Sequence, residues 1–82
     1  MAVDKEYALG RVAENISTIA HLLDCLSKID ARLAGRTSEE REKVAEGWRR
    51  QIARAQELLI KYEAEALASG ATDVEVARAK RR

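Results

Sequence analysis

The stretch that decides the fold runs from residue 45 to residue 66 and reads AEGWRRQIARAQELLIKYEAEA. Its apolar residues recur in alternating steps of three and four, at Ala45, Trp48, Ile52, Ala55, Leu59, Tyr62 and Ala66. This spacing is typical of the seam that an α-helix presents to a partner helix. The stretch therefore predicts one long amphipathic helix that needs a second helix to cover it.

The partner helix is predicted upstream, where a second set of apolar residues keeps the same spacing: Leu9, Val12, Ile16, Ile19, Leu23 and Leu26. If the chain folds back on itself, the two sets meet in reverse order, from Leu9 beside Ala66 to Leu26 beside Trp48. The sequence therefore predicts an all-α fold, an antiparallel two-helix hairpin resembling a coiled coil, over residues 1–70.

Local signals predict where the two helices begin and end. The first helix is expected to run to Leu33 and to close at Gly35 in the left-handed conformation that favours glycine. Thr37 and Glu40 have the spacing of a capping box, which starts a helix by satisfying its free amides. The second helix is then expected to stop at Gly70.

The segment 71–82 is predicted to form a short third helix and a basic tail. Thr72 and Glu75 form a second capping box, and Lys80 and two arginines follow the helical pattern. A helix this short is marginal alone, so we expect it to fold back onto the second helix. The apolar stripe expected to receive it consists of Ala53, Ile60, Ala64 and Leu67.

Composition indicates one small domain that is soluble and cytoplasmic. The 82 residues carry a formal net charge of +1, so no charge bias favours nucleic acid or membranes. The single cysteine excludes an internal disulfide, and we find no signal peptide and no apolar run long enough to cross a membrane. Two helices of this size make a thin core, which a partner subunit commonly completes.

Apolar residues in excess of the hairpin seam predict an interface with a homodimer partner. They widen the apolar stripe of the first helix and leave one leucine over on the second: Leu22, Cys25, Ile29, Leu33 and Leu58. Gly47 is unfavourable inside a helix and would allow another helix to approach closely. Two such patches would pair by two-fold symmetry into a dimeric four-helix bundle. The alternatives are a patch reserved for a different protein, or leucines that merely flank the seam.

His21 and Cys25 are the residues that most resemble a chemical site, because they lie one helical turn apart. A zinc ion would need such a pair from each of two chains, and a catalytic cysteine would need a substrate pocket. We therefore predict no catalytic residue, no cofactor and no metal site. The interpretation is that the protein is not an enzyme.

The segment from Leu26 to Leu33 resembles the first-helix pattern of the helical chorismate mutases, which are small all-helical dimers. That resemblance implies an enzyme alternative with its site on charged residues across three helices. It assigns no site residue to this chain, because the family's third helix is longer than the segment after Gly70.

Basic residues suggest a second kind of partner. They gather around Trp48 and near the end of the sequence: Arg49, Arg50, Arg54, Arg78, Lys80, Arg81 and Arg82. Such residues can neutralise phosphates without reading base sequence. The sequence as a whole favours a small non-enzymatic regulator, adaptor or inhibitor that forms a homodimer and binds a protein through a helical surface. A nucleic-acid-associated helical dimer is the alternative.

Overall fold

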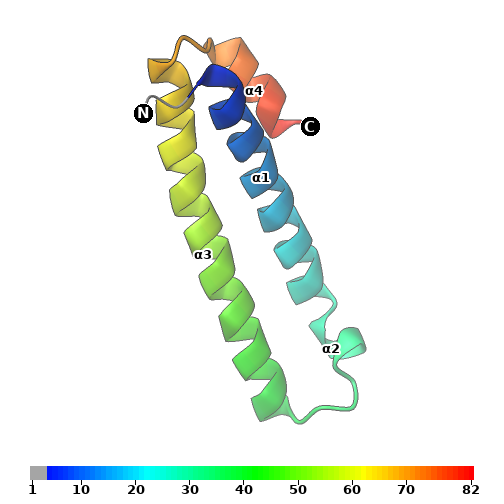
Figure 1. The fold of residues 1–82 in the computed structure, drawn as a ribbon. Coiled ribbons are helices and arrows are strands. Elements are labelled where there is room, and N and C mark those ends of the chain that lie inside the picture. Colours follow the sequence, from blue (N-terminus) through cyan, green and yellow to red (C-terminus); the bar gives the residue numbers. More distant parts are fainter. Residues whose placement is uncertain (1–3) are drawn as a thin grey trace.

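The structure is a computed structural model that describes residues 4–82 (Figure 1). It contains the helices α1 (Lys5–Ser27), α2 (Ile29–Arg32), α3 (Ser38–Ala68) and α4 (Asp73–Lys80), and no strand lies within the described range. The long helices α1 and α3 pack side by side and antiparallel, and α4 packs at the end away from the hairpin turn. The all-α hairpin with a short third helix is therefore confirmed.

The first helix is interrupted at Lys28, so the expected unbroken helix to Leu33 is wrong. The Lys28 amide is shared between the carbonyls of Asp24 and Cys25, each 3.2 Å away. The Ser27 hydroxyl also donates to the Asp24 carbonyl at 2.8 Å, and such side-chain bonds compete with the regular helical ladder. The last turn before the hairpin loop is consequently the separate short helix α2.

Both capping boxes form as predicted. Thr37 and Thr72 each accept a hydrogen bond from the amide three residues on, at 3.1 Å, and the glutamate there reaches back to the threonine amide. Gly70 ends α3 with φ of +99°, in the region that favours glycine. The expected left-handed closure at Gly35 is wrong, because Gly70 has the one positive φ within residues 4–82.

The best-buried core lies where α4 meets the hairpin. It combines side chains from α1, α3, α4 and the turn before α4: Ala8, Leu9, Val12, Ala66, Ala71, Val76 and Ala79. α4 packs chiefly against α1 rather than α3, so the expected docking onto the outer stripe of α3 is wrong. Ile60 of that stripe is 70% exposed. The reason is that α4 settles over the groove between the two long helices, where Leu9 offers it an apolar side chain.

The seam of α1 also differs from the predicted one in its second half. Leu22 is buried and Leu23 is 53% exposed, although the strict seven-residue repeat assigned Leu23 to the seam. An α-helix has 3.6 residues per turn, so its contact line drifts by about 20° per heptad. This drift amounts to about 40° in two heptads, which is less than the roughly 100° between Leu22 and Leu23, so it does not account for the difference. The hairpin contact instead follows Ala8, Val12, Asn15 and Leu22, all of them buried, whereas Leu9 is buried in the cluster under α4.

The hairpin has two broad faces. On the first, here called the α4 face, Lys5 of α1 pairs with Glu75 of α4 at 3.0 Å. On the second, here called the open face, Arg11 lies over the ring of Tyr62, 5.4 Å from its centroid. The molecule is thus a flat slab, with Cα extents of 49 × 23 × 14 Å, that α4 covers at one end of one face.

Candidate interaction surface

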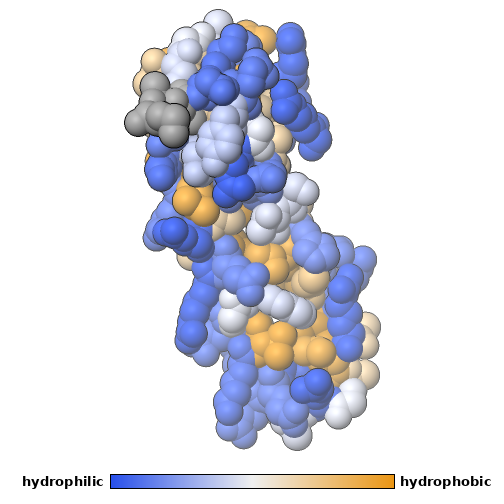
Figure 2. Space-filling view, in the orientation of Figure 1, coloured by the Kyte–Doolittle hydropathy of each residue, from blue (hydrophilic) through white to orange (hydrophobic). Residues whose placement is uncertain are grey.

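A shallow apolar hollow occupies the middle of the open face, between α1 and α3. It has a volume of about 360 Å³ and is lined by Asn15, Thr18, Arg50, Gln51, Arg54, Ala55 and Leu58. Figure 2 shows apolar atoms gathered along the middle of the molecule between hydrophilic flanks, spreading widest in the half nearer the hairpin turn. The hollow therefore offers an apolar floor with two arginines at its rim.

Asn15 gives the hollow a polar group at its edge. Its side chain is 6% exposed, and its amide nitrogen donates to the carbonyl of Arg11 at 2.8 Å within the same helix. A polar side chain in a helical seam lowers stability and commonly fixes the register of the helices. Sequence reasoning overlooked Asn15 because only apolar positions were used to trace the seam.

The structure divides the predicted interface residues into two groups. Leu22 and Cys25 are buried inside the hairpin of a single chain, at 6% and 5% exposure, so assigning them to an exposed patch was wrong. Their burial follows from the position of the α1 contact line described above. The remaining four keep partial exposure: Ile29, Leu33, Gly47 and Leu58. Leu58 lies in the hollow of the open face.

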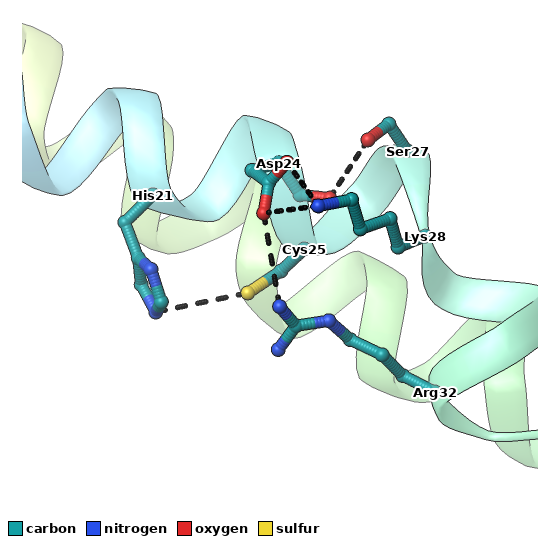
Figure 3. A network of polar contacts seen from close by, with 6 residues as sticks. All are labelled: His21, Asp24, Cys25, Ser27, Lys28 and Arg32. Carbon is teal, nitrogen blue, oxygen red and sulfur yellow. Dashed lines mark hydrogen bonds and ion pairs between the residues drawn. The ribbon is translucent and has the colours of Figure 1, made fainter.

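His21 and Cys25 come together as their spacing predicts (Figure 3). The Cys25 Sγ atom and the His21 Nε2 atom are 3.7 Å apart, with Cys25 buried and His21 exposed. Asp24 points away from them toward Lys28 and Arg32, with which it forms ion pairs of 3.1 and 3.7 Å. Within residues 4–82, no group of three or more histidine, cysteine or acidic side chains is arranged to hold a metal ion.

The basic residues lie in two separate places and have acidic neighbours. Arg49, Arg50 and Arg54 project from the middle of α3 and pair with glutamates of the same helix, at 2.8, 3.7 and 3.8 Å. At the far end of the molecule, Lys80 of α4 pairs with Glu63 of α3. The remaining basic residues of that end are exposed: Arg78, Arg81 and Arg82. The arginines thus form no single basic surface with the α4 end.

A second exposed surface was not predicted, and it lies on the α4 face beyond the end of α4. Residues seven apart on a helix return to nearly the same side. Leu9, 3% exposed under α4, therefore shares its side of α1 with Leu23, which is 53% exposed. On α3 the corresponding side carries Ile60. A second three-four spacing through Ile16 and Leu23 in the sequence could have predicted this surface. It was missed because both residues were assigned to the hairpin seam.

In comparisons with known proteins, no family model, curated protein or solved structure matches this chain. Among the described helices, none combines the length and the apolar character needed to cross a membrane.

Proposed function

We propose that the protein is a non-enzymatic, protein-binding regulator, adaptor or inhibitor, and that the hollow of the open face holds an amphipathic helix of its partner. The observation that carries this proposal is the hollow itself, an apolar floor between two parallel ridges of helix. A partner helix laid in such a groove buries an apolar side chain against the floor.

The rim of the hollow defines the chemistry of this partner. Arg54 has a side chain that is 71% exposed, so its ion pair with Glu57 contributes little stability. Acidic groups that flank the apolar anchor of the partner would meet this guanidinium group. We therefore propose an acidic amphipathic helix as the partner in place of a nucleic acid, because the floor of the hollow is apolar.

Photo-crosslinking in the native host tests this function. A benzophenone amino acid at Thr18, which is exposed and lines the hollow, is expected to give a covalent adduct of discrete mass. The matched control places the same group at Val74, 62% exposed on α4, where no such adduct is expected. Leu58→Asp or Arg54→Glu should abolish the Thr18 adduct, whereas Arg78→Glu should leave it unchanged.

Two outcomes would contradict the proposal. Equal adducts from Thr18 and Val74 would mean that the hollow has no special role. An adduct that nuclease treatment removes would instead indicate the nucleic-acid alternative, for which binding of a labelled duplex should fall steeply with salt.

A further inference from the structure

The uncovered part of the α4 face carries a second helical seam that nothing within one chain fills. On α1 it follows three-four spacing, through Ala13, Ile16, Ala20, Leu23 and Ser27. On α3 the residues of the same face are Arg49, Ala53, Gln56 and Ile60. Near the hairpin turn the groove continues into a hollow of about 320 Å³ that Leu26, Ile29 and Ala45 help to line.

We propose that this uncovered part of the α4 face binds a second copy of the chain, related by a two-fold axis perpendicular to the long helices. In that arrangement α1 packs antiparallel against α1 of the partner subunit, and α3 against its α3. Each α4 then lies beyond the hairpin turn of the other subunit. A two-fold axis along the helices would instead bring both α4 helices into the same space, so the antiparallel arrangement is the one this surface accommodates.

The side chains of this seam are complementary in size to those of a second copy when the chain is rotated about the two-fold axis. Turning the α1 stripe end for end places Ala20 opposite Leu23 of the partner subunit, a small side chain against a large one. On α3 the same operation places Ala53 opposite Gln56 of the partner subunit. These alternating layers are the packing of an antiparallel coiled coil.

The midpoints of the α1 and α3 seams, about which the two chains are related, fall at nearly the same position along the hairpin axis. Leu26 and Arg49 line one hollow, and Arg11 contacts Tyr62, so residues facing each other across the hairpin have numbers that sum to about 74. The middle of the α1 seam lies between Ala20 and Leu23, and that of the α3 seam between Ala53 and Gln56, so the two differ in height by only about 3 Å. One axis satisfies both helices.

Charge supports the same register. In an antiparallel coiled coil with Ala53 and Gln56 in facing core layers, the flanking position of Arg50 faces that of Glu57 of the partner subunit. Symmetry repeats this ion pair. The side chains of Arg50 and Glu57 are 78% and 73% exposed, and their contacts within the chain are long, at 3.7 and 3.8 Å. Both groups can therefore exchange these weak contacts for an ion pair across the interface.

The chain exposes more surface than a compact protein of its mass. The accessible surface is 5659 Å², about 800 Å² more than the roughly 4,900 Å² expected for a compact protein of 9.1 kDa. A standard protein interface buries about 800 Å² on each partner. The radius of gyration of 15.9 Å likewise exceeds the roughly 12 Å of a compact chain of this length.

Light scattering on the purified full chain is the first test. We expect a species of twice 9.1 kDa that dissociates on dilution. Leu23→Asp should raise the dissociation constant at least tenfold, because it places a carboxylate in the dimer seam. The matched control Val74→Asp, at a similarly exposed site on α4, should leave the dissociation constant unchanged.

Disulfide trapping then tests the arrangement. Ala53 and Ala64 are both exposed, lie on one side of α3, and are three helical turns apart. In a Cys25→Ala background with oxidised glutathione, Ala53→Cys should form an intermolecular disulfide, because the axis passes close to it. Ala64→Cys should not, since its symmetry mate lies about 30 Å away.

A chain that stays monomeric at millimolar concentration would overturn this inference, and so would a dimer in which Ala64→Cys crosslinks as readily as Ala53→Cys. Neither result bears on the hollow of the open face, whose partner is tested by the Thr18 crosslink. Loss of the Thr18 adduct with an intact, Ala53-linked dimer would conversely remove the proposed function and leave the dimer.

Discussion

Two glycines of this chain lie in opposite backbone conformations and predict opposite effects of substitution. A Cβ built on Gly47 meets nothing within 4 Å, whereas Gly70 has φ of +99°. Gly47→Ala should therefore raise the free energy of unfolding by about 0.5–1 kcal/mol. Gly70→Ala should lower it by about 1–2 kcal/mol, because alanine is strained in that conformation. Urea unfolding monitored by circular dichroism measures both changes.

Gly47 also discriminates between the two faces as dimer interfaces. The sequence placed Gly47 and Leu58 in the interface, whereas the dimer proposed above uses the α4 face. Gly47→Ala should then leave the dissociation constant unchanged. If Gly47→Ala weakened the dimer tenfold, the interface would instead lie on the open face, which carries Leu58.

At the level of single residues, sequence periodicity predicted the partners of the seam but not their rotation. Val12 and Ala66 occupy the core as expected. Leu22 and Leu23 differ by about 100° around the helix, and the repeat counted from Leu9 selected Leu23 because Leu9 is buried in the cluster under α4 and not by the hairpin seam alone. The burial of Asn15 was not predicted, because whether a polar residue is buried depends on the helix that packs against it.

The helix α4 is fastened at its start by one carboxylate. Glu75 pairs with Lys5 of α1 and closes the capping box of Thr72. The Lys5 ammonium, followed by the Thr72 amide, lowers the pKa of Glu75 below its ordinary value of 4.5. The resulting stabilisation is fully present above pH 4.5 and is lost as the pH falls through the lowered pKa of the folded state.

Glu75→Gln should therefore be less stable than the parent chain at pH 7, and the difference in melting temperature should shrink as the pH falls below about 4.5. Thermal unfolding at pH 7, 4.5 and 3 measures it. In a Lys5→Met background the difference at pH 7 should be smaller. A difference that is constant across this range would mean that the charge of Glu75 does not stabilise α4.

Element boundaries were predictable where they depend on local chemistry. The capping boxes at Thr37 and Thr72 involve residues three apart, so the sequence alone specifies them. The interruption at Lys28 accompanies the hydrogen bond from the Ser27 hydroxyl to the Asp24 carbonyl, and no helix propensity in the sequence marks it. The docking of α4 depends on contacts among α1, α3 and α4 together, which local sequence does not specify. The stripe containing Ile60 was predicted to receive α4 only because it is apolar.

For the whole molecule, the buried side chains are unevenly distributed. The cluster under α4 includes Val12, the largest side chain that is less than 2% exposed among the described residues. The other end has the interruption at Lys28 and the exposed loop 34–37. Stability should therefore decrease along the molecule toward the hairpin turn.

Hydrogen exchange on the Leu23→Asp variant, which we expect to be monomeric, measures this gradient. Amides of residues 12–16 and 59–66 should exchange about tenfold more slowly than those of residues 29–33 and 40–44, or more slowly still. The full chain at high concentration should gain protection around Ile16 to Leu26. Uniform protection in the variant would contradict the gradient.

The position of the α4 cluster also has a consequence for the order of folding. The cluster joins Ala8 to Ala79, so forming it closes nearly the whole chain into one loop. Loop closure costs entropy that grows with the length enclosed, and non-local contacts slow the search for the native state. The contacts near the hairpin turn are the quickest to meet and have the thinnest core to hold them. The chain should therefore begin folding where it is least stable and finish where it is most stable.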